Sequence, residues 1–303
     1  MMTASSLQSN RGTLLYKEPM SKHTSWRVGG VADQFYTPAD IEDLAGFISA
    51  LPAQELIVFI GLGSNLLVRD KGIRGTVISL QGSLSEIKCV DESSLSIGAG
   101  TSCAKLARFC HRNDLIGGEF FAGIPGLMGG ALAMNAGAFG GDTWSLVSAV
   151  TTVDRLGGVH TRLTEDFEIS YRTVKNRSTK TGEEWFVSAR LKFEKGSGEA
   201  AALRVKKLLN NRNETQPVGL PSCGSVFKNP QHDYAARLIE ASGLKGFSIG
   251  GAVVSEKHAN FIINAGDAKA GDIEKLIQYV QEIVKEKQGV ELQTEVRVVG
   301  ERH

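Results

Sequence analysis

A glycine-rich stretch from Gly117 to Gly141 constrains the fold of this chain more than any other segment. Nine of its 25 residues are glycine, compared with roughly 7% in ordinary proteins. Because each glycine inside a helix or strand costs about 0.5–1 kcal/mol relative to alanine, we expect irregular backbone here. The apolar residues between the glycines argue against a solvated linker. Two interpretations are open: a tightly packed crossover in the core, or a buried segment whose backbone N–H groups hold a large cofactor that carries phosphates.

Composition and charge are those of an ordinary globular protein. The 303 residues carry a formal net charge of +1, so there is no basic excess to attract nucleic acid or an anionic membrane. No apolar run approaches the ~18 residues of a membrane span, and the N-terminus has no apolar signal region. We therefore expect a cytoplasmic protein with neither kind of partner. The histidines form neither HExxH nor HxH, and the cysteines show no zinc spacing, so we expect no metal site.

A second glycine motif, Gly61-Leu-Gly-Ser-Asn-Leu66, follows an apolar run that we expect to be a buried strand. It begins like the dinucleotide fingerprint GxGxxG, but Leu66 stands at the third glycine position. The residues that follow leave no room for a Rossmann helix, and a Walker A motif is absent. Successive N–H groups with a hydroxyl and an amide nearby suit an anion. A plain turn is the alternative.

Hydrophobic periodicity predicts helices and strands along the whole chain, with residues 1–20 as a loosely held arm. We expect helices over residues 41–51, about 101–113, about 199–212, from Asp233 to Gly243 and from Asp272 to Gly289, with Asp40, Thr101, Asp233 and Asp272 as N-caps. We expect strands over residues 27–36, 56–60, 76–80, 185–193, 261–263 and 290–298, and hairpins over 86–98 and 147–163.

A composition break at Lys195–Gly198 marks the expected domain boundary. We divide the chain into two cofactor-binding subdomains, residues 1–82 and 83–196, and a C-terminal substrate domain, residues 197–303, whose last strand could pack back on the first two. Three polar residues in this frame could carry chemistry: Ser225, Arg172 and Glu295. From the pattern alone each is more often structural, and the serine-hydrolase elbow G-x-S-x-G is missing.

Six motifs in register favour a catalytic role for these three residues over a structural one. They are Gly61-Leu-Gly-Ser-Asn65, Gly123-Ile-Pro-Gly-Leu-Met-Gly-Gly130, Asn135-Ala-Gly-Ala-Phe-Gly140, Ser170-Tyr-Arg172, Gly224-Ser-Val-Phe-Lys-Asn-Pro230 and Glu295-Val-Arg297. In this order, over residues 20–300, the chain resembles the MurB family, the UDP-N-acetylenolpyruvoylglucosamine reductases. The version of the glycine stretch and the segment Gly243–Asn260 are similar to the subclass without the extra tyrosine loop over the substrate.

The resemblance implies an α+β fold: an FAD-binding domain of the vanillyl-alcohol-oxidase/PCMH type plus a C-terminal α+β substrate domain. FAD would be bound non-covalently, and no histidine stands in the glycine segments to tether it. The cofactor-binding residues implied are Gly61, Gly63, Ser64, Asn65, Gly100, Gly123, Ile124, Pro125, Gly126, Gly129, Gly130, Asn135, Gly137 and Ala138. Phe139 stands where many members have tyrosine, so a hydroxyl contact to the flavin is lost there.

The reaction implied is the NADPH-dependent reduction of the enolpyruvyl ether of UDP-N-acetylenolpyruvoylglucosamine to UDP-N-acetylmuramate, a peptidoglycan precursor. Hydride would come from FAD N5 and the proton from Ser225, while Arg172 pairs with the substrate carboxylate and Glu295 assists the enol form. Tyr171, Lys228 and Asn229 would bind substrate, in a monomer. Two alternatives remain: a flavoprotein of the same fold that oxidises an alcohol or amine with oxygen, and a binding module without catalysis. Cys223, near Ser225, could be sensitive to oxidation.

Overall fold

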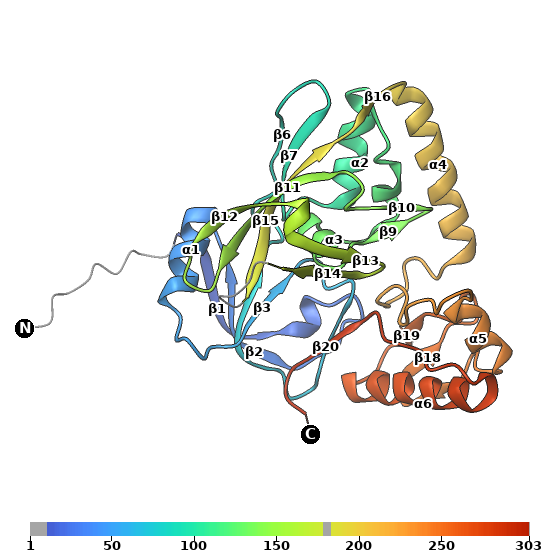
Figure 1. Ribbon diagram of the computed structural model, residues 1–303. Helices are drawn as coiled ribbons and strands as arrows, with labels where there is room; N and C mark the ends of the chain where they lie inside the picture. The colour runs from blue at the N-terminus through green and yellow to red at the C-terminus, as the bar shows by residue number, and fades with distance from the viewer. Residues whose placement is uncertain (1–10, 178–182, 303) are drawn as a thin grey trace, which may run out of the picture.

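The computed structural model describes residues 11–177 and 183–302 of the chain. In Figure 1 a first β-sheet lies at lower left, a second sheet with its helices lies above it, and a C-terminal cluster of helices and short strands lies at lower right. Strand β20 (Arg297–Val299) returns from this cluster to the first part of the chain. The mixture of helices and largely antiparallel strands confirms the expected α+β class.

The first sheet has four strands in the order β1 (Thr13–Pro19), β2 (Val31–Thr37), β5 (Ile73–Ser79) and β3 (Ile57–Ile60). Strand β1 pairs antiparallel with β2, whereas β2, β5 and β3 are parallel. The expectation of a loose arm over residues 1–20 is therefore wrong for β1, because its order comes from pairing with β2 rather than from local propensity. Residues 1–10 of that arm lie outside the described residues. Residues 27–30, expected within the second strand, precede it.

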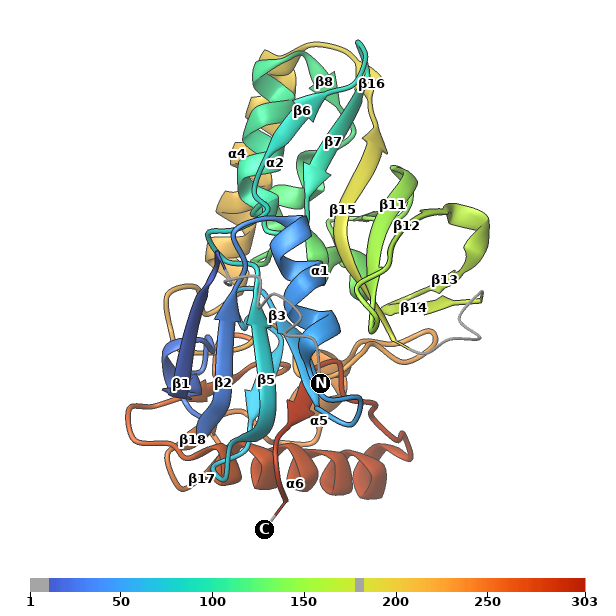
Figure 2. The same ribbon diagram turned by 90° about the vertical axis from the view of Figure 1, so that its left-hand side faces the viewer.

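Helix α1 (Ile41–Ala50) lies between the first sheet and the second (Figure 2). It begins as predicted at Asp40, whose carboxylate accepts the backbone N–H of Asp43 at 3.0 Å. Its buried face, Leu44, Phe47 and Ile48, joins one core with residues of both sheets. The helix thus fixes the first sheet against the second.

The second sheet is antiparallel throughout, in the order β12 (Val159–Leu163), β11 (Val147–Asp154), β15 (Glu184–Lys192), β7 (Ser94–Gly98) and β6 (Ile87–Cys89). Helix α2 (Cys103–Arg112) shares a hydrophobic core with strands of this sheet, and the long helix α4 (Gly198–Thr215) packs against α2. The N-cap of α2 is Ser102 rather than Thr101: its hydroxyl accepts the N–H of Lys105 at 3.2 Å. Thr101 is buried instead.

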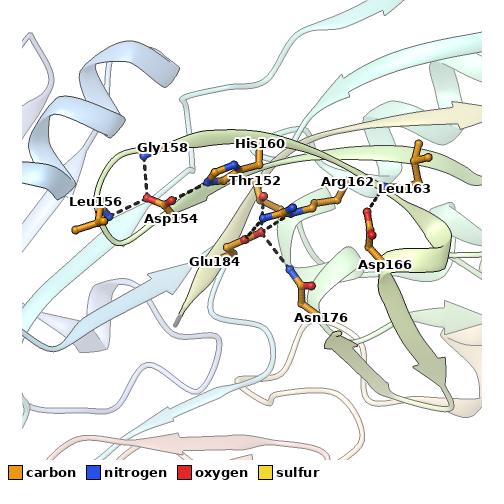
Figure 3. Close-up of polar contacts among 10 residues, drawn as sticks. All are labelled: Thr152, Asp154, Leu156, Gly158, His160, Arg162, Leu163, Asp166, Asn176 and Glu184. Atoms are coloured by element: carbon orange, nitrogen blue, oxygen red, sulfur yellow. Dashed lines mark hydrogen bonds and ion pairs between the residues drawn. The ribbon is translucent and has the colours of Figure 1, made fainter. Parts of the chain in front are cut away.

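A buried carboxylate at the start of β15 ties a neighbouring hairpin to this sheet (Figure 3). Glu184 accepts hydrogen bonds from Thr152 at 2.7 Å, from Arg162 at 2.5 and 3.1 Å, and from Asn176 at 3.1 Å. Asn176 ends the hairpin β13 (Phe167–Ser170) and β14 (Thr173–Asn176). Arg172 stands in the turn at the opposite end of that hairpin.

The glycine-rich stretch is partly buried and less irregular than expected. It contains the 3-10 helix η2 (Glu119–Gly123), helix α3 (Met128–Ala133) and the two-residue strands β9 (Gly137–Ala138) and β10 (Gly141–Asp142). The expectation of irregular backbone is wrong for Met128–Ala133, which form α3. Glycine at 129 allows it, because a Cβ there would meet the Ala99 side chain at 3.2 Å. Close packing of α3 thus offsets the poor helix propensity of glycine.

The C-terminal cluster holds α5 (Ala235–Ala241), β17 (Ser248–Ile249), β18 (Ala252–Val254), β19 (Ile262–Asn264) and α6 (Ala270–Gln288). Two expected N-caps are wrong. The residue before α5 is Tyr234, and the residue before α6 is Lys269, with Asp272 one turn inside the helix. An acidic residue satisfies N-terminal amides from either place, and the Asp272 carboxylate accepts the Lys269 N–H at 3.0 Å. Gly289 ends α6 as predicted, with φ of +70°.

The last segment is mostly not a strand. Of the expected strand 290–298, only β20 forms, in parallel pairing with β4 (Leu66–Val68). Leu292 and Val296 are nevertheless buried as the alternation predicts. The remaining short elements are η1 (Met20–Lys22), η3 (Thr164–Asp166), and the pair β8 (Leu115–Ile116) and β16 (Glu194–Lys195). Among the described residues, no helix is both long enough and apolar enough to cross a bilayer.

Candidate active site

The Gly61–Leu66 motif and the glycine-rich stretch Gly117–Gly141 lie next to each other. A Cβ at Gly61 would come within 3.2 Å of the Leu127 side chain, and one at Gly126 would lie 3.6 Å from the Ser64 hydroxyl. The Gly61–Leu66 motif follows β3, and the segment Gly123–Gly130 leads into α3. Segments more than 60 residues apart therefore form one surface.

The loop from Gly61 to Asn65 can receive an anion. None of its five backbone N–H groups donates a hydrogen bond to another residue within ranges 11–177 and 183–302. Gly63 is buried with φ of +61°, and a Cβ there would lie 2.0 Å from the His23 carbonyl oxygen, so no other residue fits. Successive unpaired amides form a concavity of positive potential. These residues fit a phosphate group of a bound cofactor.

Several other predicted cofactor residues have already used their N–H groups. The amide of Gly100 donates to Leu84 O at 3.0 Å, that of Gly126 to Ile124 O at 2.9 Å, and that of Gly129 to Ala99 O at 2.8 Å. These three N–H groups are therefore not free to hold phosphates, and cofactor binding by the three residues stays a prediction. Their lack of a side chain serves close packing instead: a Cβ at Gly100 would lie 1.7 Å from the Ser83 carbonyl oxygen.

Arg172 is held by three acceptors from distant parts of the chain. Its Nε donates to Glu295 Oε1 at 3.0 Å, Nη1 to the carbonyl of Asn135 at 3.2 Å, and Nη2 to the carbonyl of Gly137 at 2.8 Å. A guanidinium has five N–H donors, so two remain for a ligand. The backbone of Arg172 adopts φ of +53°, a region where glycine or asparagine is cheaper. The three hydrogen bonds of the side chain therefore offset the cost of a strained backbone. Such backbone strain is typical of functional positions.

Glu295 is a buried carboxyl beside two cations. Its side chain is 11% exposed. Burial raises the pKa of this carboxyl above its usual 4.5, and the charges of Arg172 and Lys228 offset only part of that rise. The site therefore contains a carboxyl that keeps its proton to higher pH than an exposed glutamate does.

Ser225 and Lys228 flank a short segment that pairs with the chain around Glu295. The N–H of Glu295 donates to Val226 O at 2.8 Å, and that of Lys228 to Gln293 O at 2.9 Å. Ser225 is half-buried immediately before this segment. The structure thus brings Arg172, Glu295 and the backbone next to Ser225 into one region, and their catalytic roles stay a prediction.

Asn65 links this region to the Gly61–Leu66 motif. Its side-chain amide donates to the backbone carbonyl of Glu295 at 3.0 Å, and its own carbonyl accepts the N–H of Arg297 at 3.1 Å. Asn135, another predicted cofactor residue, uses its side-chain oxygen to accept the N–H of Trp144. The anion-binding loop and the acidic group are therefore parts of one hydrogen-bonded unit.

A cleft of about 730 Å³ opens beside Arg172. Its walls include Tyr171 and Asn229 and the predicted cofactor residues Asn135, Gly137 and Ala138. The Arg172 guanidinium lies 5.1 Å from the centroid of the Tyr171 ring, within cation–π range. Ser225, Lys228 and Glu295 are not among the described residues that line it. Glu295 instead contacts Arg172, which is one of the cleft residues.

Comparison with known proteins identifies the family. Residues 32–162 match the family described as "FAD binding domain", and residues 216–299 match "UDP-N-acetylenolpyruvoylglucosamine reductase, C-terminal domain". A relative of the same name from Methylococcus capsulatus is 55% identical over 292 residues, covering 96% of this chain and 95% of the relative. One from Legionella pneumophila is 52% identical, covering 99% and 96%. The chain belongs to the MurB family.

The solved structure of MurB from Thermus caldophilus agrees with this assignment. It has a TM-score of 0.79 and 31% identity, and the match covers 95% of this chain and 98% of that one. The expected fold, an FAD-binding domain followed by a MurB C-terminal domain, is confirmed. The chain is an FAD-dependent oxidoreductase. The unpaired amides from Gly61 to Asn65 would hold phosphate oxygens of the FAD.

Sequence reasoning assigned two polar groups incompletely. Asn229 was expected only to bind substrate, yet its side-chain oxygen also accepts the N–H of Ala235 at 3.1 Å and so caps α5. Thr173 was not singled out, although its hydroxyl contacts Lys228 Nζ at 3.4 Å. The Asn–Pro pair that precedes α5 could have suggested a turn with a cap. Nothing in the local sequence of Thr173 indicates Lys228 as its neighbour.

Proposed function

We propose that this chain uses NADPH to reduce the enolpyruvyl ether of UDP-N-acetylenolpyruvoylglucosamine, yielding UDP-N-acetylmuramate for peptidoglycan synthesis. Relatives that carry this reductase name match over nearly the full length. The observation that supports it most is the arrangement of Arg172, fixed by three acceptors with two N–H groups to spare and facing a cleft. That arrangement suits a carboxylate, the group next to the reacting double bond.

Bound FAD supplies the hydride-transfer chemistry between NADPH and the enol ether. When hydride reaches the methylene carbon of the substrate, the electron pair of the double bond moves toward the carboxylate. The two remaining N–H groups of Arg172 bind that carboxylate and stabilise the growing negative charge. The planar fork of the Arg172 guanidinium is fixed by its three acceptors, which limits reorganisation during the reaction.

The adjacent carbon must then receive a proton. Ser225 donates it in this proposal, and Lys228, three residues on, stabilises the alkoxide that remains. Glu295, whose pKa is raised by burial, is suited to assist the enol form as an acid. Tyr171 and Asn229 contact the substrate from the cleft walls.

An anaerobic two-step titration tests the proposal. The purified protein should be yellow, lose its colour with NADPH, and regain it in proportion to added UDP-N-acetylenolpyruvoylglucosamine. Colour that returns with oxygen but not with the enolpyruvyl sugar would favour the oxidase alternative. FAD that stays bound and is reduced by no nicotinamide cofactor would favour the binding module.

The Ser225→Ala variant tests the proton donor. Bleaching by NADPH should proceed at the wild-type rate, whereas recovery with the sugar should slow by about 10²–10³-fold, as for loss of one transition-state donor. Equal slowing of both steps would remove Ser225 from the role.

A further inference from the structure

The segment Val226–Lys228 is held from two sides. On one side it pairs with the chain around Glu295, through the bonds from Glu295 N–H to Val226 O and from Lys228 N–H to Gln293 O. On the other side, among the described residues, its backbone hydrogen bonds go to Asn260. Ser225 precedes the segment directly and Lys228 ends it, so whatever fixes the segment also fixes both side chains.

Asn260 acts on this segment as a piece of neighbouring strand would. Its side-chain oxygen accepts the N–H of Phe227 at 2.9 Å, and its side-chain nitrogen donates to Phe227 O at 2.8 Å. Its backbone carbonyl accepts the N–H of Val226 at 2.9 Å. A carboxamide carries the same donor and acceptor as a peptide group, so both polar groups of Phe227 are satisfied at once.

These bonds are sheltered from water. Asn260 is 4% exposed and Phe227 1%. A buried N–H or C=O without a partner is costly, so the backbone of Phe227 would have to move to find new partners if the carboxamide were removed. Val226 is fully buried beside it, which leaves the movement to be taken up at Ser225 and Lys228.

The position of Asn260 is itself fixed. It lies in the loop between β18 and β19, just before β19. At the other end of this loop the Ser255 hydroxyl accepts the N–H groups of Lys257 and His258, both at 3.2 Å, and the Ser255 N–H donates to Phe261 O at 2.8 Å. The loop is thus closed at its base and presents the carboxamide in one orientation.

We propose that Asn260 is a positioning residue for the proton-transfer step. It holds the Phe227 backbone so that the Ser225 hydroxyl and the Lys228 ammonium stand at fixed places relative to Glu295 and Arg172. This inference rests on the proposed function, because it takes Ser225 as the proton donor. A misplacement of about 1 Å can slow an enzymatic step by about a hundredfold. The hydrogen bonds of Asn260 therefore control the rate of proton transfer.

Asn264 provides a matched control in the same cluster. It is 7% exposed, and its side chain also makes buried hydrogen bonds, to the backbone of Trp26, Gly266 and Ala268. None of these bonds involves the segment Val226–Lys228. Replacement by alanine should therefore cost comparable stability at either asparagine, but only one of them should affect proton transfer.

The experiment measures both half-reactions of the holoenzyme by anaerobic stopped flow. In Asn260→Ala, bleaching by NADPH should keep its rate, and recovery with the enolpyruvyl sugar should slow by about ten- to a hundredfold. In Asn264→Ala both rates should stay within about twofold of wild type. Hydrogen exchange should become faster at the amides of Val226 and Phe227 in Asn260→Ala, and remain unchanged there in Asn264→Ala.

If the alanine variant does not fold, Asn260→Asp provides a second test of the positioning role. An ionised carboxylate cannot donate to Phe227 O, whereas a protonated carboxyl can donate there and still accept from Phe227 N–H. Recovery should therefore be slow at high pH and approach the wild-type rate as pH falls, a dependence that loss of packing alone would not produce.

Wild-type rates of recovery in Asn260→Ala, or equal slowing in both alanine variants, would overturn the positioning role. So would a recovery rate in Asn260→Asp that follows the wild-type pH profile. If the wild-type protein itself is not reoxidised by the sugar, the proposed function fails and this inference fails with it.

Discussion

Arg172 Nε and Glu295 Oε1 lie 3.0 Å apart although 123 positions separate the two residues in the chain. The arginine stands in the turn of the β13–β14 hairpin, and the glutamate lies just before β20. Both side chains are largely buried, with 17% and 11% of their surface exposed. This ion pair therefore joins the part of the chain that precedes α4 to the C-terminal segment, at the edge of the cleft.

Replacing the arginine by lysine tests the importance of its fork. In Arg172→Lys one ammonium cannot contact Glu295, the carbonyls of Asn135 and Gly137, and a substrate carboxylate at once. We expect recovery with the enolpyruvyl sugar to slow by about 10²–10³-fold, with bleaching by NADPH unchanged. Stopped-flow measurement of both steps checks this.

Arg162→Lys is the matched control for that variant. Arg162 also pairs with a buried carboxylate, Glu184, at 2.5 Å (Figure 3). Its side chain, too, is mostly withdrawn from solvent. It lies outside the cleft, so its replacement should lower stability without slowing recovery. A similar slowing in both variants would contradict a specific role for Arg172.

The raised pKa of Glu295 predicts a particular dependence of stability on pH. A carboxyl that holds its proton more tightly when folded stabilises the protein below its usual pKa of 4.5, and this contribution is lost as pH rises through the folded pKa. Glu295→Gln removes the titration. The free energy of unfolding of wild type should therefore fall relative to the variant as pH rises from 4.5 through the folded pKa. Urea unfolding at several pH values measures this, and parallel curves would contradict it.

The network around Glu184 should behave in the opposite sense. Burial disfavours its charge, but hydrogen bonds from Arg162 and Thr152 outweigh burial and lower the pKa of the carboxyl. Its contribution is present above pH 4.5 and is lost as pH falls through the folded pKa. Glu184→Ala should cost about 3 kcal/mol near neutral pH, because it breaks a buried ion pair. A cost that does not shrink in acid would contradict this account.

The cysteines should differ sharply in reactivity. Cys89 is exposed, whereas Cys103, Cys110 and Cys223 are buried. Burial raises the pKa of each buried thiol to about 12, so almost none is present as the reactive thiolate. A thiol reagent should label Cys89 rapidly in the native protein and the other three on unfolding. Cys89→Ser should abolish the rapid phase. Rapid labelling of Cys223 would restore the oxidation-sensitive role considered from its sequence position.

Much of the local structure could be predicted from residue pattern. Helix α1 begins at Asp40 because a short acceptor side chain precedes an apolar stripe, and α6 ends at Gly289 because glycine readily adopts positive φ. The caps of α5 and α6 were misplaced because a carboxylate can satisfy N-terminal amides from more than one position. Strand β1 was missed because its order depends on pairing with β2.

The sequence by itself determined the family and the flavin-binding fold, because six motifs in register carry that information; the residues that would do chemistry stay a prediction. Only the tertiary structure decided which glycine amides are unpaired, how Arg172 is anchored and what holds the segment after Ser225. These depend on hydrogen bonds between residues far apart in the chain, such as Asn260 with Phe227. A local pattern specifies the donor and the acceptor, but only folding brings the two together.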